Sequence, residues 1–170
     1  MWMILIGYLV GSVLGGRLYG LISGHDLSKS GSGNTGARNA FRAGGVKAFL
    51  FVYGFDVLKT VLVLSFSGTY FWETALALTV GHIYPLWQMR RGGKGYAVFS
   101  GIILAYSPLW FVAGLLLLLV FIKLTGNSRE TGLVMLILLP LAALGEWSDV
   151  MISCVILSII WWHHRKGKTT

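Results

Sequence analysis

Charge is what this sequence has least of. Only 12% of its 170 residues are charged, and just six are Asp or Glu. An ordinary soluble domain is about a quarter charged, so the composition argues against a soluble globular protein. The single cysteine, Cys154, excludes an intramolecular disulfide. We expect this cysteine to be a small, buried apolar residue of the last apolar segment.

Residues that could bind a metal are equally few. His25 with Asp26 is too sparse for a site, and His163 and His164 are adjacent, so they do not share one helical face. The nucleotide-binding pattern Gly-x4-Gly-Lys-[Ser/Thr] is missing. The His-x4-Asp pair of soluble-facing acyltransferases is also missing. We therefore expect neither a metal nor a cofactor.

Apolar residues, in contrast, make up 55% of the chain and give a mean hydropathy of +0.73. They occur in blocks, and a helix needs roughly 20 such residues to cross a bilayer. The pattern predicts an all-α polytopic membrane protein, with a single domain over residues 1–170. The fourth and sixth blocks are short. We expect them to be tilted, broken or partly re-entrant helices, which membrane proteins tolerate where a helix lines a wet cavity. The seven expected spans are Trp2–Ser23, Val46–Ser67, Tyr70–Trp87, Tyr96–Tyr106, Leu109–Leu124, Leu133–Leu144 and Val150–Trp162.

The positive charges lie at the ends of these spans. A net charge of +8 could indicate nucleic acid, but placement beside membrane spans explains it better, so we expect a lipid bilayer and no nucleic acid as partner. The connections near residues 68–69, 107–108 and 145–149 carry no Lys or Arg. The positive-inside rule then places the N-terminus outside and the C-terminus inside. The cations of the alternate connections are Lys29, Arg38, Arg42, Lys47, Arg90, Arg91, Lys94, Lys123, Arg129, Arg165, Lys166 and Lys168.

Glycine recurs at every fourth position of the first span, a spacing that predicts close helix packing. Arg17, on the same helix, must face the protein interior, water or a polar partner, or else extend to the inner interface. Asp56 and Lys59 are three residues apart in the second span, so we expect them to pair and to serve structure before catalysis. The repeated glycines are Gly7, Gly11 and Gly15, followed by Gly16, Gly20 and Gly24.

The most informative segment is the polar loop at residues 31–42, Gly-Ser-Gly-Asn-Thr-Gly-Ala-Arg-Asn-Ala-Phe-Arg. Its glycines allow positive φ and turn backbone N–H groups inward, into a nest that binds anions, most often phosphate. A flexible linker is the alternative interpretation, but a linker needs neither two asparagines nor two arginines. Side-chain donors come from Ser32, Asn34, Thr35 and Asn39, and guanidinium groups suited to phosphate from Arg38 and Arg42.

A second glycine-rich segment, Gly92-Gly93-Lys94-Gly95, directly precedes the fourth span. It combines backbone donors, a lysine and a partly positive helix end, all of which suit phosphate. His82 lies shortly before it, although a membrane histidine can be an interhelical hydrogen-bond donor and nothing more. Two such loops on one membrane face indicate a site for phosphorylated substrates.

These two segments resemble the signatures of the bacterial acyl-phosphate-dependent glycerol-3-phosphate acyltransferases, the PlsY family. The first is the loop at residues 31–42, and the second is Gly-His-Ile-Tyr-Pro at 81–85 with Gly-Gly-Lys-Gly at 92–95. Gly11-Ser12 and the Asp56…Lys59 pair match as well, so the resemblance extends to about Gly101. It implies a compact seven-helix enzyme of the bacterial inner membrane, without metal or cofactor. The enzyme would move a fatty acyl group from acyl phosphate to glycerol 3-phosphate, giving lysophosphatidate and phosphate.

The resemblance also implies roles for residues in this sequence. Ser32, Arg42, His82 and Lys94 would be catalytic, with His82 close to the reacting centre. Because both substrates carry phosphate, two anion sites are expected, and an activated donor mainly needs positioning and charge stabilisation. The implied substrate-binding residues are Ser32, Gly33, Asn34, Thr35, Gly36, Arg38, Asn39, Arg42, Gly92, Gly93, Lys94 and His163.

The chain departs from the family pattern at several positions. Arg38 stands where the family usually has threonine, Tyr96 replaces a small aliphatic residue, and Lys166 sits about where an asparagine is expected. A serine-rich third motif is barely visible at residues 127–131. The alternative is a divergent, non-enzymatic membrane protein such as a small anion or phosphate transporter. Transporters often contain internal repeats. This sequence shows no convincing repeat, because the two glycine loops differ in length, spacing and polar content. The sequence gives no indication of oligomeric state, acyl-chain preference or exact acceptor.

Overall fold

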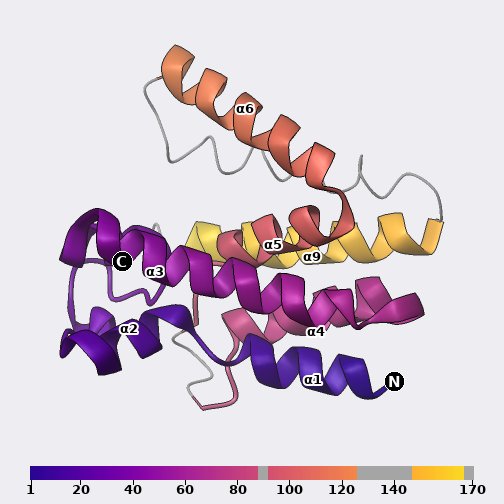
Figure 1. The fold of residues 1–170 in the computed structure, drawn as a ribbon, viewed down its shortest axis with the longest axis horizontal. Helices are drawn as coiled ribbons and strands as arrows, with labels where there is room; N and C mark the ends of the chain where they lie inside the picture. Colours follow the sequence, from indigo (N-terminus) through magenta and orange to yellow (C-terminus); the bar gives the residue numbers. More distant parts are fainter. Residues whose placement is uncertain (88–91, 126–146, 167–170) are drawn as a thin grey trace. The chain divides into compact units, whose positions relative to one another are not determined.

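The computed structural model describes residues 1–87, 92–125 and 147–166, and every regular element within these ranges is a helix (Figure 1). The all-α prediction is therefore confirmed for the described chain. The residues group into two compact units, Met1–Ile102 and Ile103–Thr170. The single domain over residues 1–170 stays a prediction.

The first predicted span, Trp2–Ser23, is not one continuous helix. It consists of α1 (Trp2–Gly11) and α2 (Gly15–Ser23), which meet at an angle of 42°. Leu14, directly before α2, has extended backbone angles of φ −92° and ψ 127°. Together the two helices have the length and hydropathy of one span, so the predicted apolar segment exists but is broken in its middle.

The second span belongs to α3 (Ala37–Ser65), which is 29 residues long. Among the described residues it is the one helix long and apolar enough to cross a membrane alone. It begins nine residues before the predicted start at Val46, and so includes the second half of the polar loop. Gly45, with φ 68° and ψ −158°, interrupts the helical geometry and kinks α3 at this point.

The remaining helices follow the predicted apolar blocks. A short 3-10 turn, η2 (Gly68–Tyr70), leads into α4 (Phe71–Ile83), and α5 (Tyr96–Tyr106) has the predicted bounds. The second unit contains α6 (Pro108–Thr125) and α9 (Trp147–Lys166). The predicted span Leu133–Leu144 lies outside the described residues, so the count of seven stays a prediction. Cys154 is exposed on α9 rather than buried as predicted; its neighbours Met151 and Val155 are exposed too, so this helix carries apolar side chains outward.

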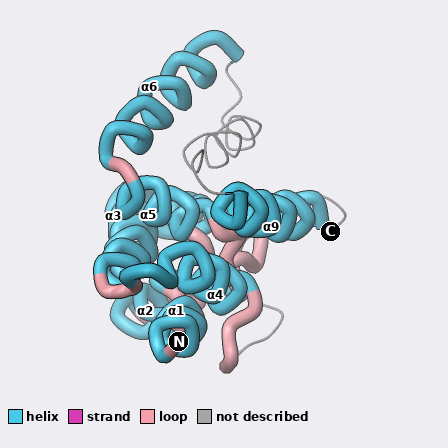
Figure 2. The backbone as a smooth tube through the Cα atoms, turned by 90° about the vertical axis from the view of Figure 1, so that its right-hand side faces the viewer, coloured by secondary structure: helices cyan, strands magenta, loops and turns pink. Residues whose placement is uncertain are grey.

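Glycine lets α1 and α4 touch backbone to backbone, and α1 packs mainly on α4 (Figure 2). A Cβ on Gly7 would lie 3.0 Å from the carbonyl oxygen of Thr74, and one on Gly11 would overlap the carbonyl oxygen of Leu78. Gly81 of α4 lies just as close to the carbonyl of Tyr8. The predicted glycine packing is therefore confirmed for Gly7 and Gly11 against α4, and for Gly15 against α3, where a Cβ would lie 2.8 Å from the carbonyl oxygen of Val52.

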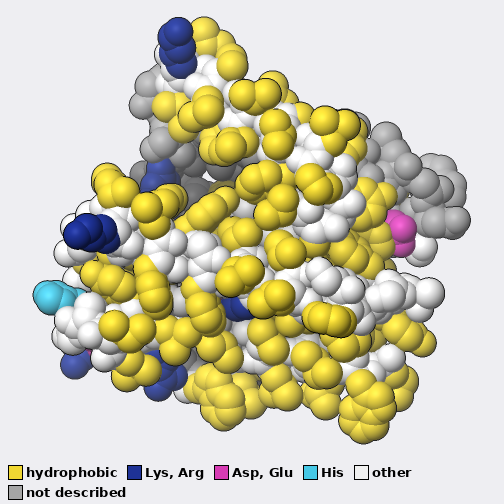
Figure 3. Space-filling view, in the orientation of Figure 1, with side chains coloured by type: hydrophobic (Ala, Val, Ile, Leu, Met, Phe, Trp, Pro, Cys, Tyr) yellow, Lys and Arg dark blue, Asp and Glu magenta, His cyan; other side chains and the backbone are white. Residues whose placement is uncertain are grey.

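Large apolar side chains remain exposed on the outer faces of α1 and α3, and Figure 3 shows many hydrophobic side chains spread over the visible face. Leu5 and Leu9 of α1 and Leu58 and Leu62 of α3 are 40–57% exposed. Contiguous apolar surface on this scale marks an interaction with another apolar phase. It fits a protein whose sides face hydrocarbon.

Gly81→Ala is expected to lower the thermal unfolding midpoint of the detergent-purified protein. The new methyl group would overlap the carbonyl oxygen of Tyr8 and lie 3.1 Å from the amide nitrogen of Ser12. Overpacking of this kind costs about 1–3 kcal/mol. Gly54→Ala is the matched control, since a Cβ there meets nothing within 4 Å. Equal midpoints for the two variants would contradict the described α1–α4 packing.

Candidate functional site

The first loop is organised by Asn39, which is only 3% exposed. Its Nδ2 donates to the carbonyls of Leu27 and Ser30, both at 2.9 Å, and its Oδ1 accepts from the amide of Ser32 at 2.9 Å. Gly31, at φ 57°, passes so close that a Cβ would overlap this oxygen. Asn39, predicted to bind substrate, thus holds the loop's own backbone in shape.

The middle of the loop is fastened to α3 and to α2. The Oδ1 of Asn34 accepts from the amide of Gly36 at 2.8 Å, directly before α3 begins. Thr35 is 5% exposed, and a Cβ on Gly16 would overlap its carbonyl oxygen. Gly16 is therefore required so that the first loop can lie directly against the start of α2.

The outer side of this loop is cationic and accessible. Ser32 and Gly33 are exposed, and so are Arg38 and Arg42 in the first turns of α3. Residues four apart lie on one face of a helix, so the two guanidinium groups share a face. The N-terminal end of α3 adds its partial positive charge there. Serine, two arginines and a helix start are the elements of an anion site.

The second loop packs closely against the last residues of α4. The amide of Gly93 donates to the carbonyl of His82 at 3.0 Å. A Cβ on Gly93 would overlap Nε2 of the His82 ring, and one on Gly92 would overlap the carbonyl oxygens of His82 and Ile83. These glycines were predicted to offer amides to phosphate; the structure shows that close packing also requires them. Lys94 follows and is partly exposed, and Gly95 turns the chain into α5 at φ 85°.

A buried cluster of Asp56, Lys59 and His82 lies beneath this loop. The Nζ of Lys59 is 2.7 Å from Oδ1 of Asp56 and 3.3 Å from Nδ1 of His82, whose Nδ1 is 3.7 Å from the same carboxylate oxygen. The three side chains are 2–5% exposed. The predicted Asp56–Lys59 pair is therefore confirmed.

This ion pair explains the break between α1 and α2. Lys59 donates to the carbonyls of Gly11 and Val13 at 3.2 and 2.6 Å, and Asp56 accepts from the amide of Gly15 at 3.2 Å. The last carbonyls and the first amides of a helix lack partners within it. The ammonium of Lys59 thus donates to the free carbonyls at the end of α1, and the carboxylate of Asp56 accepts from the free amide at the start of α2. Each charge also has the sign that the adjoining helix dipole favours.

Both loops are consequently attached to the same break. The first loop contacts it through Gly16, and the second contacts it through His82. The Oγ of Ser12, at the end of α1, accepts from the amide of Leu86 at 3.2 Å and donates to the carbonyl of Tyr8 at 2.9 Å. Gly11-Ser12 was among the residues that match the family pattern, but the sequence assigned Ser12 no role.

His163, the remaining predicted site residue, is not placed in this arrangement. His163 is a partly exposed residue of α9, in the second unit, and its position relative to the loops is not described. Arg90 and Arg91, and residues 127–131, lie outside the described residues. Within the ranges the structure describes, no group of three or more His, Cys, Asp or Glu is placed to hold a metal ion.

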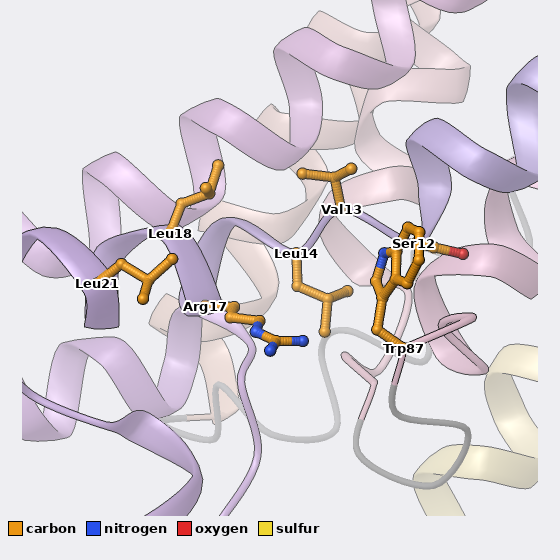
Figure 4. Close-up of a pocket in the computed structure, with 7 residues that line it drawn as sticks. All are labelled: Ser12, Val13, Leu14, Arg17, Leu18, Leu21 and Trp87. Atoms are coloured by element: carbon orange, nitrogen blue, oxygen red, sulfur yellow. The ribbon is translucent and has the colours of Figure 1, made fainter.

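An open recess of about 380 Å³ lies beside the break (Figure 4). Apolar side chains form most of its lining, and the guanidinium of Arg17 extends from α2 toward Leu14 and Trp87. Its complete lining is Ser12, Val13, Leu14, Arg17, Leu18, Leu21 and Trp87.

Known proteins are similar to this chain in both sequence and fold. The family model described as glycerol-3-phosphate acyltransferase matches residues 1–169. A glycerol-3-phosphate acyltransferase of Listeria monocytogenes is 38% identical over 94% of this chain and 86% of its own length. One of Agrobacterium fabrum is 35% identical over 96% of this chain and 83% of its own.

Two crystal structures of PlsY, an integral membrane glycerol 3-phosphate acyltransferase, are also similar. The glycerol 3-phosphate form aligns with a TM-score of 0.88 at 28% identity, covering 99% of this chain and 89% of that one. The lysophosphatidic acid form gives a TM-score of 0.84 with the same identity and coverage.

Proposed function

Because this chain belongs to the glycerol-3-phosphate acyltransferase family, we propose that it transfers a fatty acyl group from acyl phosphate to glycerol 3-phosphate. The products are 1-acylglycerol 3-phosphate and inorganic phosphate, in phospholipid synthesis. The match of the family model over residues 1–169 carries this proposal. The chain is an acyltransferase and an integral membrane protein, and a non-enzymatic transporter is not favoured.

The reaction needs no cofactor to balance. The acceptor hydroxyl attacks the acyl carbon, the bond from that carbon to the phosphate oxygen breaks, and the hydroxyl proton leaves with inorganic phosphate. Since the donor is already activated, the protein's task is to position two phosphorylated molecules and to stabilise charge. Ser32, Arg38 and Arg42 would hold one phosphate group at the start of α3. Lys94 would hold the other.

His82 is better suited to positioning than to chemistry in this arrangement. It is 2% exposed, its Nδ1 faces Lys59, and its Nε2 faces Gly93. Because protein atoms lie against both ring nitrogens, His82 would support the second loop. The loop would then present Lys94 to the substrate. Asn39 would support the first loop in the same way. The remaining predicted binding residues of the two loops, Asn34, Thr35 and Gly36 among them, are proposed as parts of the same site, and His163 stays a proposed substrate-binding residue.

The protein would lie in the bacterial inner membrane as a single domain with seven spans. Both glycine-rich loops would face the cytoplasm, where glycerol 3-phosphate is dissolved, with the N-terminus outside and the C-terminus inside. Cations in the first loop, and their scarcity in the connections near residues 68–69 and 107–108, support this orientation.

Single cysteines should test this topology. In a Cys154→Ser background, which removes an exposed native thiol, a cysteine at Asn34 should react with a membrane-impermeant maleimide only after the cells are opened. One at Trp147 should react in intact cells. Labelling of the Asn34 position from outside would remove the case for cytosolic substrates.

Purified protein should release phosphate and form a monoacyl product from long-chain acyl phosphate and glycerol 3-phosphate. Acyl-CoA should be a poor donor, because the sequence has neither a nucleotide loop nor a His-x4-Asp pair. Phosphate release without glycerol 3-phosphate is the control for hydrolysis. Acylation from acyl-CoA but not from acyl phosphate would overturn the donor. Phosphate uptake into sealed vesicles without any acyl transfer would favour the transporter.

A further inference from the structure

At the end of α4, partners from two other segments replace a helical hydrogen bond. In a helix that continued past Ile83, the amide of Leu86 would donate to the carbonyl of His82, four residues before it. The Leu86 amide instead donates to the hydroxyl of Ser12 at 3.2 Å. The carbonyl of His82 accepts from the amide of Gly93 at 3.0 Å. A hydroxyl from the α1–α2 break and an amide from the second loop thus take the two places of one helical bond.

Ser12 holds the Leu86 amide from a fixed position. It is only 2% exposed, and the residues on either side of it, Gly11 and Val13, give their carbonyls to Lys59 at 3.2 and 2.6 Å. Both neighbouring peptide groups are thereby attached to α3. The side chain of Leu86 is 46% exposed, so its main chain makes the attachment to Ser12.

Two further contacts draw the chain after α4 toward α1. The hydroxyl of Tyr8 donates to the carbonyl of Tyr84 at 3.3 Å. Trp87, directly after Leu86, lines the same recess as Ser12 (Figure 4). The chain that leaves α4 is therefore held beside the end of α1, and the last carbonyls of α4 are left to the second loop.

We propose that Ser12 is a positioning residue for the second loop: it takes the Leu86 amide, leaves the His82 carbonyl to Gly93, and so fixes Lys94 directly before α5. The kinetic consequence rests on the proposed function, in which Lys94 holds a substrate phosphate. Ser12 itself is buried and acts through Lys94. Its place in α1 means that the first helix of the chain contributes to a substrate site formed more than 80 residues later.

Amide hydrogen exchange tests this role without any turnover. In Ser12→Ala, the freed Leu86 amide competes for the His82 carbonyl, so the Leu86 and Gly93 amides should exchange about two- to tenfold faster, as expected for the loss of an ordinary hydrogen bond. The Ser32 amide, which Asn39 holds in the first loop, should exchange as in the wild type.

Ser65→Ala is the matched control. The Ser65 hydroxyl also donates to the carbonyl four residues before it, that of Val61 at 2.8 Å, but it lies at the last residue of α3, opposite the end that carries the first loop. This variant should leave exchange at Gly93 unchanged. A thermal unfolding midpoint near that of the wild type should show that both variants are folded.

Kinetics test whether the effect passes through Lys94. Ser12→Ala should lower kcat/KM by about two- to tenfold, through the KM of the same substrate whose KM Lys94→Ala raises. It should cause no further loss in a Lys94→Ala background, where no ammonium remains to be positioned. In an Arg42→Ala background it should cause its full loss, because that side chain belongs to the first loop.

Unchanged exchange at Gly93 in Ser12→Ala would overturn the proposal, and so would an equal change in Ser65→Ala. A full additional kinetic loss in the Lys94→Ala background would also overturn it, because Ser12 would then act independently of Lys94. Faster exchange at Gly93 in a protein that shows no acyl transfer would reject the proposed function and keep the placement of the second loop by Ser12.

Discussion

Replacing Lys59 with methionine is expected to leave little folded protein after detergent extraction. The change leaves the Asp56 carboxylate buried without its cation and takes the donor from the carbonyls of Gly11 and Val13. Removing one partner of a buried ion pair lowers the free energy of unfolding by about 3–5 kcal/mol. That is a large share of the roughly 5–15 kcal/mol that typically stabilises a folded protein. Thermal unfolding and the yield of monodisperse protein on gel filtration measure the effect.

The double variant Asp56→Asn with Lys59→Met should recover part of this loss, because neither charge then remains buried alone. Asparagine still offers an oxygen to the amide of Gly15. Lys47→Met, at an exposed position of the same helix, is the control for loss of a lysine and should unfold near the wild-type temperature. A Lys59→Met protein as stable as this control would contradict the structural role given to the cluster.

Arg42→Ala and Lys94→Ala should each lower kcat/KM by about tenfold or more while the protein remains folded. Both are surface-accessible cations beside glycine-rich backbone, and a hydrogen bond to a charged group is worth roughly 1.5–3 kcal/mol. Each step of about 1.4 kcal/mol corresponds to about a factor of ten in rate. Initial rates with acyl phosphate and glycerol 3-phosphate varied separately show which substrate each residue serves.

Lys47→Ala is the matched control for both variants, because it removes an exposed lysine five residues beyond Arg42. It should keep full activity. If Lys94→Ala also keeps full activity, residues 92–95 are a packing element for His82 and not a substrate site. If each variant affects the KM of a different substrate, the two loops divide the phosphates between them.

The sequence predicted those features that depend on neighbouring residues. The bounds of α5 coincide with the predicted Tyr96–Tyr106 because local signals mark both ends. Gly95 turns the chain at φ 85° before the helix, and Pro108 opens the next helix after it. The Asp56–Lys59 pair was predictable in the same way, since a spacing of three places both side chains on neighbouring positions of one helix.

Features that depend on distant residues were missed or only half understood. The apolar run at residues 2–23 shows no sign of a break, because the partners that stabilise it lie more than 40 residues away on α3. Gly92 and Gly93 were interpreted as phosphate donors, since their packing on His82 becomes visible only when the end of α4 is placed. Asn39 looked like a ligand-binding amide until its loop partners were known.

The broken first span has a consequence for how the protein is made. As α1 and α2 leave the ribosome, the carbonyls of Gly11 and Val13 and the amide of Gly15 have no partners from Asp56 or Lys59, which have not yet been synthesised. Unsatisfied backbone groups are costly in hydrocarbon. We therefore expect α1 and α2 to reach full depth only after α3 enters beside them. Insertion should then be cooperative between these helices, and a truncation before Lys59 should integrate poorly.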